Sequence, residues 1–173
     1  FAALLSYLKT GDTEFLKKPS LLLKDRDFEI IPEISPVLNL DTLPFPRREL
    51  LKDRDFKFYQ KRGVSLLFSR GCPNACSFCV SSKIFGKTYR CRAGISVLQE
   101  MRFCFEKWGV TVFNFEDDNF FRNPAQTEAL LKEIIRFKKN PGIDFDLTAM
   151  NGMSVEHMTA ESVELLKRAG FNE

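Results

Sequence analysis

The sequence predicts an α/β fold built on a parallel sheet, and three observations support this. Short apolar runs that are typical of buried strands occupy residues 64–68, 110–115 and 145–150. Each run is followed by a segment with the periodicity of a helix. Strand–helix units in succession give parallel strands joined by right-handed crossovers. Because three such units make roughly half of an eight-unit barrel, we expect a partial parallel (βα) barrel.

Each predicted helix has its own start or stop signal. Residues 94–108 place Leu98, Met101, Phe105 and Trp108 on one stripe, and Gly109 ends the segment. In the second helix, Asn123 suits an N-cap and Pro124 suits the first helical position. In the third, Thr159 is the expected cap, and the helix continues to Gly170.

The first sixty residues show a different pattern. Residues 1–8 have leucines at helical spacing, and residues 20–31 indicate two short strands around a charged turn. Four prolines then mark a linker, and a short helix is expected at 47–51. We therefore divide the chain into a terminal helix (1–10), a linker region (11–60) and the partial barrel (61–173).

Composition excludes several classes of protein. The 173 residues are 44% hydrophobic and 28% charged, which suits a globular fold. A formal net charge of +3, with scattered basic residues, gives no argument for nucleic acid. No apolar run is long enough to span a membrane, and no signal peptide is seen. Five cysteines, three of them clustered, do not form a secreted disulfide framework, so we expect a reducing cytoplasm.

The most informative stretch is residues 69–79, which follow the first predicted strand. It contains Cys72, Cys76 and Cys79 in the spacing C-x3-C-x2-C. In barrel enzymes, the loops at the carboxyl ends of strands carry the active site. Thiolates are soft metal ligands, and an iron–sulfur cube normally takes four of them. Three therefore predict a metal site with one open position, as catalytic metal sites have.

This stretch resembles the cluster loop of the radical S-adenosylmethionine (SAM) enzymes, whose signature has an aromatic residue before the last cysteine, here Phe78. The resemblance implies that the three cysteines hold a 4Fe–4S cluster whose open iron binds SAM. It implies reductive cleavage of SAM to a 5′-deoxyadenosyl radical that abstracts hydrogen from a substrate. It also implies an electron donor such as flavodoxin or ferredoxin, while the substrate remains unknown.

The flanking sequences Ser-Arg-Gly-Cys-Pro and Cys-Ser-Phe-Cys resemble those of the branch of this family that has an upstream cobalamin-binding domain. Residues 1–8 resemble the last helix of that domain, and residues 40–46 resemble the segment that joins the domain to the barrel. The resemblance thus leaves cobalamin-dependent methyl transfer or rearrangement open. It also identifies the chain as a fragment with roughly the first three units of the barrel, which need not be active alone.

An acidic stretch, Glu116-Asp117-Asp118, follows the second predicted strand on the same face as the cysteines. Acids at a strand end can bind an ammonium group, or they can form a solvated loop. The stretch resembles the family motif beside the amino group of SAM, and we select Asp117 and Asp118 for that contact. Asn151, after the third strand, is a further polar candidate.

The alternative is a non-catalytic module that binds zinc or a cluster. Structural zinc takes four ligands, usually in two pairs. Outside the loop, the candidates are Cys91, Cys104 and His157, and none forms a second C-x-x-C. Arginines at 90 and 92 could face the carboxylate of SAM or belong to an ordinary charged loop.

Overall fold

A computed structural model describes residues 8–12, 23–25, 28–30, 36–52, 56–58 and 60–171. The chain separates into two compact units, Phe1–Val37 and Leu38–Glu173. In the first unit, β1 (Leu23–Asp25) and β2 (Phe28–Ile30) pair antiparallel, which confirms the two predicted short strands. Residues 8–10 are helical, whereas the rest of the helix predicted at 1–8 lies outside the described residues.

The second unit is built on a four-stranded sheet in the order β3-β4-β7-β8. Strands β4 (Lys61–Leu66), β7 (Val112–Phe115) and β8 (Asp146–Thr148) are parallel, as predicted. The short β3 (Lys57–Phe58) pairs antiparallel with the start of β4. Beyond β8, Phe171 forms a parallel bridge with Leu147.

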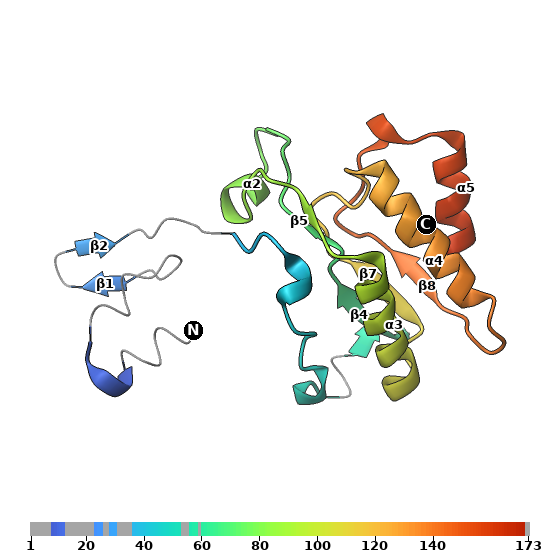
Figure 1. Cartoon of the computed structure of the whole chain (residues 1–173), viewed down its shortest axis with the longest axis horizontal. Helices are drawn as coiled ribbons and strands as arrows, with labels where there is room; N and C mark the ends of the chain where they lie inside the picture. The colour runs from blue at the N-terminus through green and yellow to red at the C-terminus, as the bar shows by residue number, and fades with distance from the viewer. Residues whose placement is uncertain are drawn as a thin grey trace. The chain divides into compact units, whose positions relative to one another are not determined.

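Three helices lie on one face of these strands: α3 (Gly94–Trp108), α4 (Pro124–Lys138) and α5 (Ala160–Ala169) (Figure 1). Their capping signals are confirmed. The Asn123 side chain accepts from the backbone N–H of Gln126, Thr159 forms a capping box, and Gly109 ends α3 in the left-handed conformation. Within the described residues, every helix is too short or too polar to form a transmembrane span.

The buried stripe of α3 differs from the predicted one. Val97, Met101 and Cys104 are fully buried, whereas Leu98, Phe105 and Trp108 only pack against the edge of the core. The helix is therefore rotated by about one residue relative to the prediction, since positions three and four apart share a face. Phenylalanines fill much of the core, and Phe120 packs against the rings of Phe68 and Phe115.

The first parallel strand starts and ends earlier than residues 64–68. It begins at Lys61 because β3 pairs with residues 61 and 62. It ends at Leu66 because the N–H of Phe68 donates to the carboxylate of Asp117 and not to a neighbouring strand. A small hairpin, β5 (Ser69–Arg70) with β6 (Arg90–Cys91), then encloses the cysteine stretch. Before β4, two 3-10 turns, η2 (Leu40–Thr42) and η3 (Arg48–Leu50), interrupt the linker, close to the short helix expected at 47–51.

Candidate functional site

The three clustered cysteines lie on one segment, residues 71–80, which we call the cysteine loop. It leaves β5 at the carboxyl end of the first parallel strand and leads into α2 (Ser81–Ile84). Cys72 is buried and its N–H donates to the carbonyl of Gly86 over 3.3 Å, whereas Cys76 and Cys79 are exposed. All three thiols are free, so they are available as ligands.

The thiol of Cys79 differs in its acidity from the two thiols outside the loop. A hydrogen bond from Ser81 lowers the pKa of Cys79 from its ordinary value. Burial instead raises the pKa of both Cys91 and Cys104 to about 11. Because the thiolate is the form that binds metals, the hydrogen bond from Ser81 favours the ligand form of Cys79, and burial disfavours that form in Cys91 and Cys104. Cys104, on α3, is fully buried in the apolar core of the protein, as expected for a small apolar residue.

The sulfurs of the loop do not converge in this structure, although the spacing predicts that they face a common point. Among the residues that the structure describes, no three Cys, His, Asp or Glu side chains are grouped as a metal site. The donor set itself fits an iron–sulfur cluster, since it consists of three free thiols within eight residues.

Asp117 follows β7 and is buried beneath the start of the cysteine loop. Its carboxylate accepts from the N–H of Phe68 over 3.1 Å and from both the N–H and the hydroxyl of Ser69. Burial raises its pKa from 3.8 to about 6, against the effect of these hydrogen bonds. The side chain thus holds the backbone where it leaves β4.

Asp118 accepts a hydrogen bond from the same segment, two residues beyond Ser69. Its Oδ2 accepts from the N–H of Gly71 over 3.1 Å. Gly71 has φ of +87°, and a Cβ added there would lie 2.3 Å from the carbonyl oxygen of Thr88. The two predicted acids therefore lie beside the cysteine loop, as expected, but both hold the backbone of its entrance.

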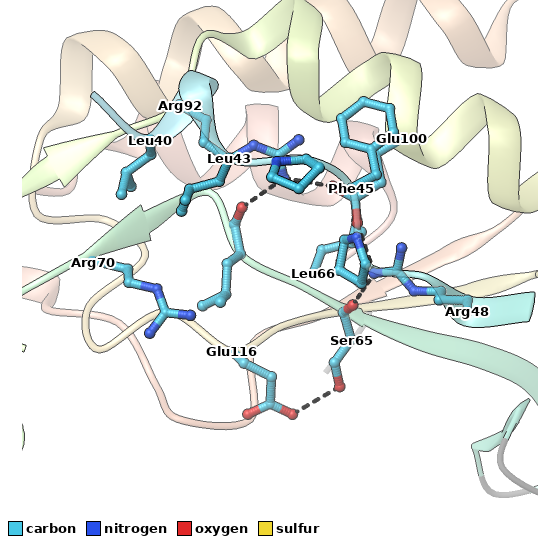
Figure 2. A pocket seen from close by; sticks show the side chains of 13 residues that line it. Leu40, Leu43, Phe45, Arg48, Ser65, Leu66, Arg70, Arg92, Glu100 and Glu116 are labelled. Atoms are coloured by element: carbon cyan, nitrogen blue, oxygen red, sulfur yellow. Dashed lines mark hydrogen bonds and ion pairs between the residues drawn. The ribbon is translucent and has the colours of Figure 1, made fainter. Parts of the chain in front are cut away.

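Glu116 is the acid of this stretch that faces open space. Its Oε1 accepts from the hydroxyl of Ser65 over 3.1 Å and from the amide of Asn114, and its Oε2 accepts from Asn151 over 3.2 Å. It lines a pocket of about 260 Å³ together with Arg70 (Figure 2). The structure thus brings Asn151, predicted to be near the site, into contact with an acid that we did not select.

The alternation of side chains along β7 carried the signal for Glu116. Phe113 and Phe115 belong to the apolar core, and Asp117 follows in phase with them. Glu116 is in phase with Asn114 and faces the opposite side. Reading this period of two beyond the end of the strand would have distinguished the acids.

The arginines at positions 90 and 92, after the loop, hold the backbone through hydrogen bonds and do not form an ordinary charged loop. Arg90 donates to the carbonyls of Phe85 and Thr88 over 2.6 and 3.1 Å. Arg92 donates to the carbonyl of Leu67 over 3.0 Å and pairs with Glu100. Phe78, the aromatic residue of the motif, is 89% exposed at the tip of the loop. The cysteine loop is therefore held at its entrance, and the chain that returns from it is held by Arg90 and Arg92.

Comparison with known proteins relates this chain to methyltransferases. No protein-family model matches it. An uncharacterized methyltransferase of Pyrococcus horikoshii is 31% identical over 113 residues, which cover 65% of the chain and 24% of the relative. Cytidylyl-2-hydroxyethylphosphonate methyltransferase of Streptomyces wedmorensis is 26% identical over 80% of the chain and 27% of its own length. The chain spans about a quarter of these relatives.

A solved structure shows a similar fold. The radical SAM methyltransferase TsrM of Kitasatospora setae, with cobalamin and a 4Fe–4S cluster bound, superposes with a TM-score of 0.59 and 27% identity. The match covers 65% of this chain and 21% of that one. A second structure of the same enzyme holds tryptophan and a SAM analogue.

Proposed function

We propose that this chain, which is related to the radical SAM methyltransferases, is the cluster-binding part of such an enzyme. In this proposal Cys72, Cys76 and Cys79 each hold one iron of a 4Fe–4S cluster. One observation carries the proposal: three free thiols with the family spacing lie on a loop anchored at the end of the first parallel strand. When bound, the cluster supplies the electron that cleaves SAM to a 5′-deoxyadenosyl radical, for hydrogen abstraction or cobalamin-dependent methyl transfer.

The protein's own part is to fix the loop and to bind SAM. Asp117 and Asp118 hold the entrance of the loop, and Arg92 holds the chain that returns from it, while Cys76 and Cys79 lie exposed. Phe78 at the tip is proposed to cover the cofactor, because its apolar ring is otherwise left in water.

We assign the contact with the amino group of SAM to the acids at the end of β7. Glu116 is the leading candidate because it lines the pocket, and Asp118 is the second because it is only partly buried. Asp117, with its carboxylate already occupied by three donors, is proposed to position the loop. Arg70, on the same pocket, suits the carboxylate of a ligand.

The wider architecture is also a proposal. The bridge from Leu147 to Phe171 has the direction and position of a fourth parallel strand next to β8, which supports a barrel of more units. We propose that residues 61–173 are the first half of that barrel, that residues 11–60 are the linker, and that residues 1–10 end a cobalamin-binding domain. The substrate is proposed to be a small molecule, the electron donor a flavodoxin or ferredoxin, and the compartment the cytoplasm.

Anaerobic reconstitution with iron and sulfide tests the proposal. The chain should turn brown, hold about four irons, and bind SAM with a change in the spectrum of the reduced cluster. A colourless protein with one tightly bound zinc and no affinity for SAM would refute it and establish the zinc module.

A further inference from the structure

A buried carboxylate in the middle of α3 has no part in the proposed chemistry. Glu100 is 1% exposed, and it pairs with two arginines. Its Oε1 lies 2.7 Å from Nη2 of Arg48, and its Oε2 lies 2.5 Å from Nη1 of Arg92. The arginine side chains are themselves only 6% and 12% exposed. Burying three charges is costly unless further hydrogen bonds satisfy the remaining donors.

Those further bonds go to the outer edge of β4. Arg48 donates to the carbonyl of Ser65 over 2.7 Å, and Arg92 donates to the carbonyl of Leu67 over 3.0 Å. The carbonyl between them, on Leu66, accepts from the N–H of Glu116 after β7. Since successive carbonyls of a strand point to opposite sides, the two arginines cover the edge that β7 does not use.

The same group fixes residues 40–48, the part of the linker region that is called the linker below, against β4. Arg48 belongs to the linker, and the ring of Phe45 lies 5.5 Å from the guanidinium of Arg92. Asp41 also accepts from the N–H of Ala93 over 2.9 Å, just before α3. The linker thereby becomes one wall of the pocket that holds Glu116 and Arg70 (Figure 2).

We propose that Glu100 is a positioning residue that couples the linker to the cysteine loop. Through Arg48 it holds the linker wall over the pocket, and through Arg92 it holds the segment where the chain returns from the loop. The backbone N–H of Arg92 also donates to the carbonyl of Phe68 over 2.8 Å, beside the point that Asp117 holds. This inference rests on the proposed function, because it assumes that the pocket takes SAM.

The two arginines separate the effects. Arg48→Met releases the linker but leaves Glu100 paired with Arg92. We expect protease to cut the linker about tenfold faster, the Kd for SAM to rise about tenfold, and the iron content to stay unchanged. Arg92→Met should lower the iron content as well as the affinity for SAM. Glu100→Gln leaves two buried arginines without a counter-charge and is expected to misfold, so the arginine variants carry the test.

Arg47→Met is the matched control, because Arg47 is the neighbouring arginine, is 74% exposed and pairs locally with Glu49. It should alter none of the three readouts. Faster proteolysis of Arg48→Met with the wild-type Kd for SAM would show that the contact between Arg48 and Glu100 only stabilises the fold. That result would overturn this inference and leave the proposed function standing. A wild-type chain that takes up no cluster would overturn the proposed function, and the role in the pocket with it.

Discussion

Replacing Asp117 with Asn tests whether the acids after β7 hold the loop or bind the cofactor. Asn keeps one carbonyl oxygen but turns an NH2 group toward backbone N–H donors at Phe68 or Ser69, which Asp117 now satisfies. Hydrogen bonds to a charged group contribute about 1.5–3 kcal/mol each. Because Asn also removes a buried charge, we expect a net loss of about 2 kcal/mol, or roughly 4–8 °C in Tm.

The assay compares iron content, Tm and SAM affinity in the same reconstituted protein. Loosening the entrance of the cysteine loop should lower the iron bound per chain. The fraction that does hold a cluster should bind SAM as the wild type does, because Asp117 does not line the pocket. Normal iron content and Tm with a Kd for SAM raised about tenfold would refute this reasoning and make Asp117 a ligand of SAM, as the sequence motif suggests.

The pH dependence of stability gives the same residue a second signature. Burial raises the pKa of Asp117 from 3.8 to about 6, so between these values the folded protein binds more protons than the unfolded chain. The contribution of Asp117 to stability should therefore fall by about 3 kcal/mol as pH rises from 4 to 6, and stay constant above that. Asn does not titrate there, so the difference in unfolding free energy between wild type and variant isolates this term. A difference that is flat with pH would contradict the buried site.

Three further predictions follow from the site. Cys76→Ala should abolish cluster assembly while Cys104→Ala, in the core, leaves iron content normal; equal iron in both would exclude the loop as the ligand set. Glu116→Gln should raise the Kd for SAM about tenfold at unchanged iron content, and an unaltered titration would remove it from the binding site. Gly71→Ala should prevent the loop from forming, because its Cβ would lie 2.3 Å from a backbone oxygen, whereas Gly86→Ala, with a similar φ of +82° and open space, should cost only about 1 kcal/mol by thermal unfolding.

The sequence was sufficient for the elements whose signals are local. Caps at Asn123 and Thr159 and the stop at Gly109 placed the helices correctly, since each involves only neighbouring residues. The pairing of β5 with β6 was missed, because it joins segments separated by the cysteine loop and is only two residues long. The contact between Arg48 and Glu100 was missed for the same reason, since 52 positions separate two charges that look like ordinary surface residues.

The acids after β7 show why a motif alone does not decide which of several neighbouring residues reaches a pocket. A motif specifies which residue types occur together at a strand end, but the pleat of the strand decides which side chain reaches which face. Asp117 continues the buried series of Phe113 and Phe115, and the backbone amides of Phe68 and Ser69 meet it there. Glu116 continues the series of Asn114 and reaches the pocket. Neighbouring acids in sequence therefore have different surroundings: Asp117 supports the entrance of the cysteine loop, and Glu116 lines the pocket.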